Sequence, residues 1–231
     1  MKVRSDGFSR FVRFGAWAAI VSGVTLVAAF VMEWLVVPYE RLGTGAYLTV
    51  SYLVSASLRL VAGILLIWAL IGLYAPQSRA AGTFGLWAFV VAFFGASLNL
   101  GNNWAELFVW PTLALVAPDV ISGKATEAPS YLASGISLSV PLLGIGVILF
   151  GIATFIARVY PRWAAALLIV SIPVTIFLSP TPGTFRESIG QILFGIAVAV
   201  LGWHAKPTPS RAETQPQARR DQGPEQEPRS V

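Results

Sequence analysis

The chain has 231 residues, of which 55% are hydrophobic and only 12% charged, and it carries a formal net charge of +5. Soluble domains are charged at about a quarter of their residues, so this composition excludes an ordinary water-soluble fold. The sequence contains no cysteine, which excludes disulfides, iron–sulfur clusters, thiolate zinc sites and cysteine nucleophiles. The apolar runs lack the alternation of barrel strands, so we expect helices to cross the membrane.

Apolar stretches close to the length that spans a bilayer, about 20 residues, recur along the chain. They cover residues 14–37, 48–74, 84–106, 136–157, 163–179 and 188–205. The pattern predicts an all-α, polytopic membrane bundle of about six transmembrane helices, formed by residues 1–205. Residues 206–231 hold almost no apolar side chain, and we expect them to form a disordered cytoplasmic tail.

The third hydrophobic region, residues 84–117, is longer than one perpendicular span requires. Gly101 and Pro111 are the candidates for a break, because glycine loosens a helix and proline removes one of its hydrogen bonds. We therefore expect this helix to end near Trp110 and residues 112–134 to form an external excursion.

The distribution of lysine and arginine predicts the orientation, because cytoplasmic segments are enriched in both. With the N-terminus inside, the cytoplasmic basic residues are Lys2, Arg4, Arg10, Arg13, Arg79, Arg158, Arg162, Lys206 and Arg211. The external connections then hold only Arg41, Lys124 and Arg186. The sequence thus predicts a plasma membrane protein with both termini inside. Its Ala, Gly, Arg and Pro bias favours a bacterial inner membrane.

Polar side chains in the apolar stretches recur at helical spacing, so each set shares one face of its helix. The candidate cluster for ligand binding or for structural ion pairing is Glu33, Arg59, Asn99, Asn102, Asn103, Glu106 and Gln191. One hypothesis is a pocket open to the outside, in which Arg59 binds an anionic group or pairs with Glu33 or Glu106. We prefer Glu106, since Asn102 and Asn103 could accept from the remaining guanidinium donors. The other hypothesis is a purely structural ion pair with amide hydrogen bonds between helices.

Small residues at four-residue spacing predict close helix contacts. Ala19 and Gly23 form one such pair, and Gly195 and Ala199 form another. The contacts could lie within one subunit or between subunits.

Cofactor and catalytic patterns are not found in the sequence. His204 is the single histidine, so a bis-histidine haem cannot form, and no serine lies in a nucleophile-elbow pattern. We therefore expect no cofactor, no metal and no catalytic residue. Nucleic-acid binding is not expected either, because the basic residues concentrate at helix ends and in the tail.

Residues 146–170, GVILFGIATFIARVYPRWAAALLIV, join a glycine-rich helix to an alanine- and leucine-rich helix through a short basic turn. This stretch resembles uncharacterised bacterial multi-pass integral membrane proteins. The resemblance covers only the fourth and fifth predicted helices. It implies a cytoplasmic hairpin around Arg158 and Arg162, and no activity.

The sequence favours a non-enzymatic membrane protein, such as an accessory or assembly subunit, above two alternatives. The first alternative is a small-molecule or ion transporter with an outward-facing polar pocket, and the weaker one is a membrane enzyme. The expected partners are membrane lipids and either a second copy of the chain or another membrane protein.

Overall fold

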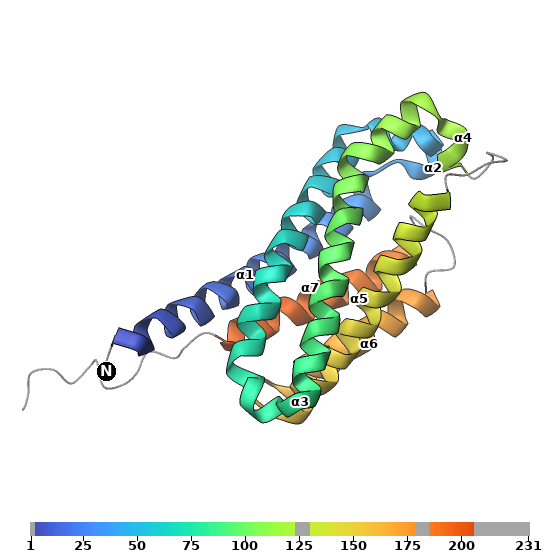
Figure 1. Cartoon of the computed structure of the whole chain (residues 1–231). Helices are drawn as coiled ribbons and strands as arrows, with labels where there is room; N and C mark the ends of the chain where they lie inside the picture. The colour runs from blue at the N-terminus through green and yellow to red at the C-terminus, as the bar shows by residue number, and fades with distance from the viewer. Residues whose placement is uncertain (1–2, 123–129, 179–184, 206–231) are drawn as a thin grey trace, which may run out of the picture.

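The computed structural model describes residues 3–122, 130–178 and 185–205, and every regular element in these ranges is helical (Figure 1). The elements are α1 (Val3–Val36), α2 (Tyr39–Leu42), the 3-10 helix η1 (Gly43–Leu48), α3 (Val50–Val116), α4 (Pro118–Ile121), α5 (Ser130–Ala157), α6 (Arg162–Leu178) and α7 (Phe185–Ala205). In these ranges α1, α3, α5 and α7 are long and apolar enough to span a membrane, and α6 is a shorter apolar helix. The predicted all-α class is confirmed. The predicted tail, residues 206–231, lies outside the described residues.

Helix α3 is a hairpin of two helical arms, residues 50–81 and 83–116, which run side by side in opposite directions (Figure 1). Gly82 makes the turn with φ 58° and ψ −154°, a conformation that is essentially restricted to glycine. The rings of Tyr74 and Phe89 stack across the arms with centroids 4.5 Å apart. The two arms correspond to the second and third predicted helices.

The helices form a closed ring in which each neighbour runs antiparallel to the next. Helix α1 packs on the first arm of α3, the second arm packs on α5, α5 on α6, α6 on α7, and α7 returns to α1. The core between them is built from alanine, leucine and valine with buried Phe150 and Phe194. Because the ring is closed, every helix has one face toward the interior of the bundle and one face toward its surroundings.

Small residues let these helices approach closely. A Cβ added to Gly23 on α1 would collide with the carbonyl oxygen of Gly195 and would lie 2.8 Å from the Cβ of Ala199. The predicted small-residue pairs on α1 and α7 therefore contact each other within one chain. At Gly95 an added Cβ would lie 2.6 Å from the Cα of Leu143, so the second arm of α3 also contacts α5 at backbone distance.

The expected break in the third hydrophobic region is wrong. Helix α3 continues through Gly101 and Pro111 to Val116, and α5 begins at Ser130 instead of residue 136. A proline costs a membrane helix one backbone hydrogen bond, whereas ending the helix there would leave several more polar groups without partners. The connection between α3 and α5 is therefore shorter than residues 112–134, and it contains the one-turn helix α4.

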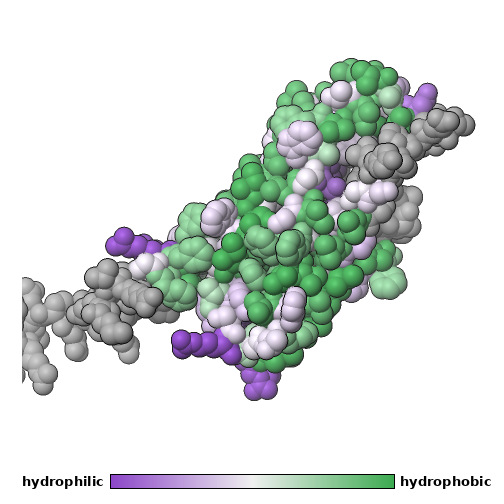
Figure 2. Space-filling model, viewed as in Figure 1, coloured by the Kyte–Doolittle hydropathy of each residue, from purple (hydrophilic) through white to green (hydrophobic). Residues whose placement is uncertain are grey.

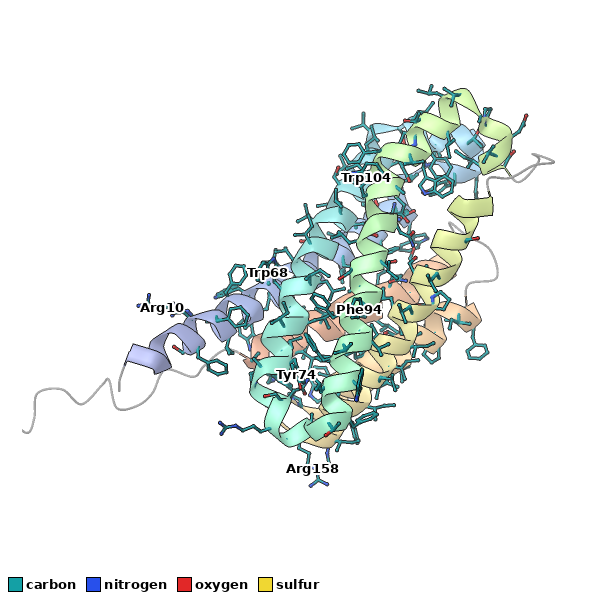
Figure 3. The ribbon with its side chains drawn as sticks, viewed as in Figure 1. Arg10, Trp68, Tyr74, Phe94, Trp104 and Arg158 are labelled. Carbon is teal, nitrogen blue, oxygen red and sulfur yellow. The ribbon has the colours of Figure 1, made fainter. Side chains whose placement is uncertain are left out.

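The outer surface is apolar along the length of the bundle and polar at its ends. Figure 2 shows hydrophobic residues over most of this face and hydrophilic ones at the two ends. Trp68, Phe94 and Trp104 are exposed, and Figure 3 shows them on the helices between those ends. Arg10 and Arg158 project from the same end (Figure 3), the end that also holds the Gly82 turn. This surface suits a protein embedded in a bilayer.

Candidate functional site

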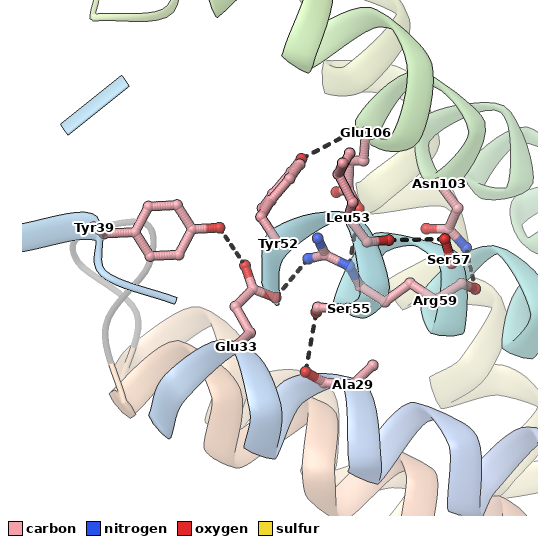
Figure 4. Close-up of polar contacts among 10 residues, drawn as sticks. All are labelled: Ala29, Glu33, Tyr39, Tyr52, Leu53, Ser55, Ser57, Arg59, Asn103 and Glu106. Atoms are coloured by element: carbon pink, nitrogen blue, oxygen red, sulfur yellow. Dashed lines mark hydrogen bonds and ion pairs between the residues drawn. The ribbon is translucent and has the colours of Figure 1, made fainter. Parts of the chain in front are cut away.

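The centre of the candidate site is Arg59, which lies between two carboxylates from two other helical segments (Figure 4). Its Nη1 donates to Glu33 Oε2 of α1 at 2.7 Å, and its Nε lies 3.2 Å from Glu106 Oε2 of the second arm of α3. The exposed fractions of the side chains are 9% for Arg59, 13% for Glu33 and 29% for Glu106. A charge this deeply buried needs opposite charges beside it, and the two carboxylates provide them.

Tyr39 completes the surroundings of Glu33. The chain reverses after Pro38, and α2 places the Tyr39 hydroxyl so that it donates to Glu33 Oε1 at 2.7 Å. Burial raises the pKa of Tyr39 far above its usual value, and the negative charge of Glu33 raises it further. The hydroxyl therefore keeps its proton and remains a donor. Both oxygens of Glu33 are thus engaged, one by Tyr39 and one by Arg59.

Two aromatic rings enclose the guanidinium. Its Cζ lies 5.7 Å from the centroid of the Phe30 ring and 5.8 Å from that of Tyr52, both within the range of cation–π attraction. The Tyr52 hydroxyl donates to the backbone oxygen of Glu106 at 2.9 Å, which ties the two arms of α3 together beside the ion pairs. The two rings therefore cover part of the guanidinium.

Serine hydrogen bonds set the register that brings these charges together. Ser55 Oγ donates to the backbone oxygen of Ala29 at 3.1 Å, and Ser22 Oγ donates to that of Ala62 at 2.8 Å. Ala29 precedes Glu33 by one helical turn, and Ser55 precedes Arg59 by one turn. The hydroxyls therefore fix α1 against the first arm of α3 at the level of the ion pair.

A cavity of about 560 Å³ opens beside Arg59, in the half of the bundle that carries α2 and α4. Residues from α1, both arms of α3, α5, α6 and α7 line it, so it lies inside the helix ring. Its polar lining includes Arg59, Asn99, Asn102, Asn103, Glu106 and Gln191. Its apolar wall includes Phe30, Leu66, Trp110, Ile176 and Phe194. This volume falls within the range of pockets that hold small molecules, about 300–1,000 Å³.

The structure therefore brings the predicted cluster into one place. Glu33 contacts Arg59, and the other predicted residues line the cavity. The choice of Glu106 over Glu33 as the partner of Arg59 was too narrow, because the guanidinium contacts both acids and its hydrogen bond goes to Glu33.

The predicted role of the asparagines as acceptors for the guanidinium is wrong. Asn103 Nδ2 donates to the backbone oxygen of Arg59 at 3.1 Å, and Asn102 Nδ2 donates to Ser139 Oγ on α5 at 2.6 Å. Helical side chains tilt toward the N-terminal end of their helix. The Arg59 side chain accordingly extends past Asn103 to the level of Glu106.

Sequence reasoning missed the aromatic residues around the ion pair. Tyr52 lies two helical turns before Arg59, on the face already defined by Ser55, so its spacing could have identified it. Phe30 and Tyr39 gave no such signal, because an apolar phenylalanine within a span and a tyrosine after a proline are both common.

Metal binding finds no support among the described residues. These residues contain no group of three or more His, Cys, Asp or Glu side chains that could hold an ion. His204 lies at the opposite end of the bundle, exposed, with its Nδ1 2.9 Å from the backbone oxygen of Val200.

No protein-family model, curated protein or solved structure matches this chain. Its function must therefore be inferred from the cavity and from the charges beside it.

Proposed function

We propose that this chain is a multi-pass membrane protein that binds a small molecule in the cavity beside Arg59 and carries it across the bilayer. The observation that supports the proposal is the 560 Å³ cavity inside the helix ring, with both charged and apolar groups in its wall. Ligand sites combine a mostly apolar lining with a few placed polar groups in the same way. A purely structural ion pair would need no adjoining space of this size.

The proposed topology has six spans, with both termini in the cytoplasm of a bacterial cell. Each arm of α3 exceeds the length needed for one crossing, and α1, α5, α6 and α7 supply the others. Exposed Arg79, Arg158 and Arg162 lie at the end of the bundle away from the cavity, which suits the cytoplasmic side. The cavity then lies in the outer half of the bilayer, and the partners are membrane lipids.

This proposal ranks transport above an accessory or assembly role. The small-residue contacts that could have held a partner subunit are occupied within the chain by α1 and α7. An enzyme remains the weaker alternative, since Glu106 could act as a base but no activated nucleophile accompanies it among the described cavity residues. Assembly with a second copy or another membrane protein is compatible with this proposal, because the cavity lies inside the helix ring.

Filling the cavity tests the proposal. Ala105 lines the cavity, whereas Leu98 on the same arm is exposed on the outer surface, so Ala105→Phe and Leu98→Phe form a matched pair. Native mass spectrometry of protein extracted from its own membranes should find a small molecule bound to the unchanged chain and to Leu98→Phe, and absent from Ala105→Phe. Equal occupancy in both variants would contradict binding in the cavity.

A further inference from the structure

The cavity extends sideways between α5 and α6. These helices contact each other at Gly144, where an added Cβ would lie 3.2 Å from Ile172 Cγ2. One turn after Ile172, Ile176 lines the cavity and is 67% exposed. Ile145 lines it too and is 54% exposed, although it lies about 200° around α5 from Val147, which faces the core. The cavity therefore reaches from the interior of the ring to its outer surface.

The unequal lengths of α5 and α6 account for this side opening. Both helices meet at the connection between Ala157 and Arg162, but α5 has 28 residues and α6 has 17. Helix α5 accordingly continues past the end of α6 toward α4 (Figure 1). Exposed Leu138 on α5 and exposed Phe177 on α6 border this region. An opening among exposed apolar side chains on a membrane helix bundle suits contact with lipid.

Two amide side chains lie at the level of the opening. Asn99 and Gln191 line the cavity, and among the described residues neither amide has a hydrogen-bond partner. A Cβ added to Gly190 would collide with Thr175, so Gln191 lies beside the turn of α6 that carries Ile176. Each amide can both donate and accept, and both are available to a polar group in the cavity.

The floor of the cavity, its part farthest from α2 and α4, is apolar. Buried Leu66, Val147 and Phe194 form it. Phe194 follows Gln191 by nearly one turn of α7, so the floor lies beyond the amides in the direction of the Gly82 turn. Polar groups at one level and hydrocarbon at the next repeat the order of head group and chain within one leaflet of a bilayer.

We propose that the occupant is one amphipathic lipid, which enters from the bilayer between α5 and α6. Asn99 and Gln191 bind its polar head group, and a hydrocarbon chain lies on the floor against Phe194. This inference rests on the proposed function and names its substrate class. A water-soluble molecule would require neither an opening toward the apolar surface nor a floor of hydrocarbon.

The test uses phosphatidylethanolamine and phosphatidylglycerol, each with a diazirine halfway along one acyl chain, in nanodiscs that hold the full chain. After illumination, peptide mapping by mass spectrometry locates the labelled residues. Any surrounding lipid can label exposed Phe177, whereas buried Phe194 can be reached only from inside the cavity. We expect at least one probe to label Phe194, and unlabelled lipid of the same kind to compete with it.

Ile176→Trp and Phe177→Trp form a matched pair for the opening. Both place tryptophan on the exposed surface of α6, but of the two positions only 176 lines the cavity. Ile176→Trp should lower the labelling of Phe194 by about fivefold or more, because the larger side chain overfills the opening. Phe177→Trp should leave it unchanged. Equal labelling of Phe194 in both variants would overturn entry between α5 and α6.

Gln191→Met tests the head-group site, since it removes the amide with little change in size. It should lower the labelling of Phe194 as well. Gln77→Met is its control, because Gln77 is buried near the Gly82 turn and its amide has no hydrogen-bond partner among the described residues. Unchanged labelling in Gln191→Met would overturn the role of that amide.

The outcomes separate this inference from the proposed function. Labelling confined to exposed residues such as Phe177 would mean that lipid only surrounds the bundle, and would overturn the inference. The proposed function would then stand if Ala105→Phe still removes a bound small molecule, and fail if it removes none. If Ile176→Trp does not fold, labelling of Phe194 in the unchanged chain still decides whether a lipid chain occupies the cavity.

Discussion

At the scale of single residues, the two acids that share Arg59 are not equivalent. Glu33 makes the hydrogen-bonded contact at 2.7 Å and is the less exposed of the two, whereas Glu106 lies at 3.2 Å and borders the cavity. The geometry therefore separates a carboxylate that secures the arginine from one that borders the cavity. We expect the first to contribute more to stability, and in the proposed function the second lies beside the bound molecule.

Double-mutant cycles on the free energy of unfolding should show this difference. Arg59→Leu alone leaves two acids beside an apolar group and should cost about 3–5 kcal/mol, the range for breaking a buried pair. Combining it with Glu33→Gln should recover more of that loss than combining it with Glu106→Gln, because coupling follows distance and burial. Unfolding in mixed detergent micelles measures both couplings. A larger coupling to Glu106 would contradict this assignment.

At the scale of the helices, glycine has opposite roles at two positions of one arm. Gly95 contacts the backbone of α5 so closely that an added Cβ would lie 2.6 Å from Leu143, whereas Gly101 has open space around it. Gly95 therefore permits the contact between the second arm of α3 and α5. Gly101 makes no such contact and loosens the helix without a compensating gain.

Alanine at these positions should shift stability in opposite directions. Gly95→Ala forces the helices apart and should lower the free energy of unfolding by about 1–3 kcal/mol. Gly101→Ala removes backbone freedom from the unfolded chain and should raise it by about 0.5–1 kcal/mol. The same detergent unfolding measurement reports both changes. A loss at Gly101 similar to that at Gly95 would show that Gly101 also lies in a close contact, and would contradict the difference drawn between the two positions.

At the scale of the whole molecule, ring closure gives the bundle two distinct ends. The Gly82 turn, the connection between α5 and α6, and the first turns of α1 share one end, with exposed Arg79 and Arg158. The cavity, α2 and α4 lie toward the other. On the proposed topology, the positive-inside rule predicts that the cavity lies on the external side.

Cysteine labelling tests this orientation. Because the sequence contains no cysteine, an introduced cysteine is the only thiol that the reagent can label. Ser122→Cys follows α4 and Ala80→Cys precedes the Gly82 turn, and both positions are exposed. A membrane-impermeant maleimide on intact cells should label the cysteine at 122 and reach the one at 80 only after permeabilisation. Labelling of position 80 in intact cells would reverse the orientation and turn the cavity toward the cytoplasm.

The apolar runs and the helical spacing of polar residues were enough to predict the all-helical class. They were also enough to predict that Glu33, Arg59 and Glu106 face inward. Both signals are local, because hydrophobic length and a period of 3.6 residues act within one helix. These two signals overestimated the effect of Pro111, since helix α3 continues through it. The free-energy cost of ending a helix in lipid depends on the groups around the break, which one sequence position does not reveal.

Only the tertiary structure decided that one arginine serves two carboxylates, that Tyr39 binds the first of them, and that space remains beside the second. These features depend on the register between helices, which Ser22 and Ser55 set through hydrogen bonds to carbonyls on neighbouring helices. A pattern along one helix holds no information about the level at which its neighbour lies, so the contacts of Arg59 and the cavity beside it could be found only from the packed ring.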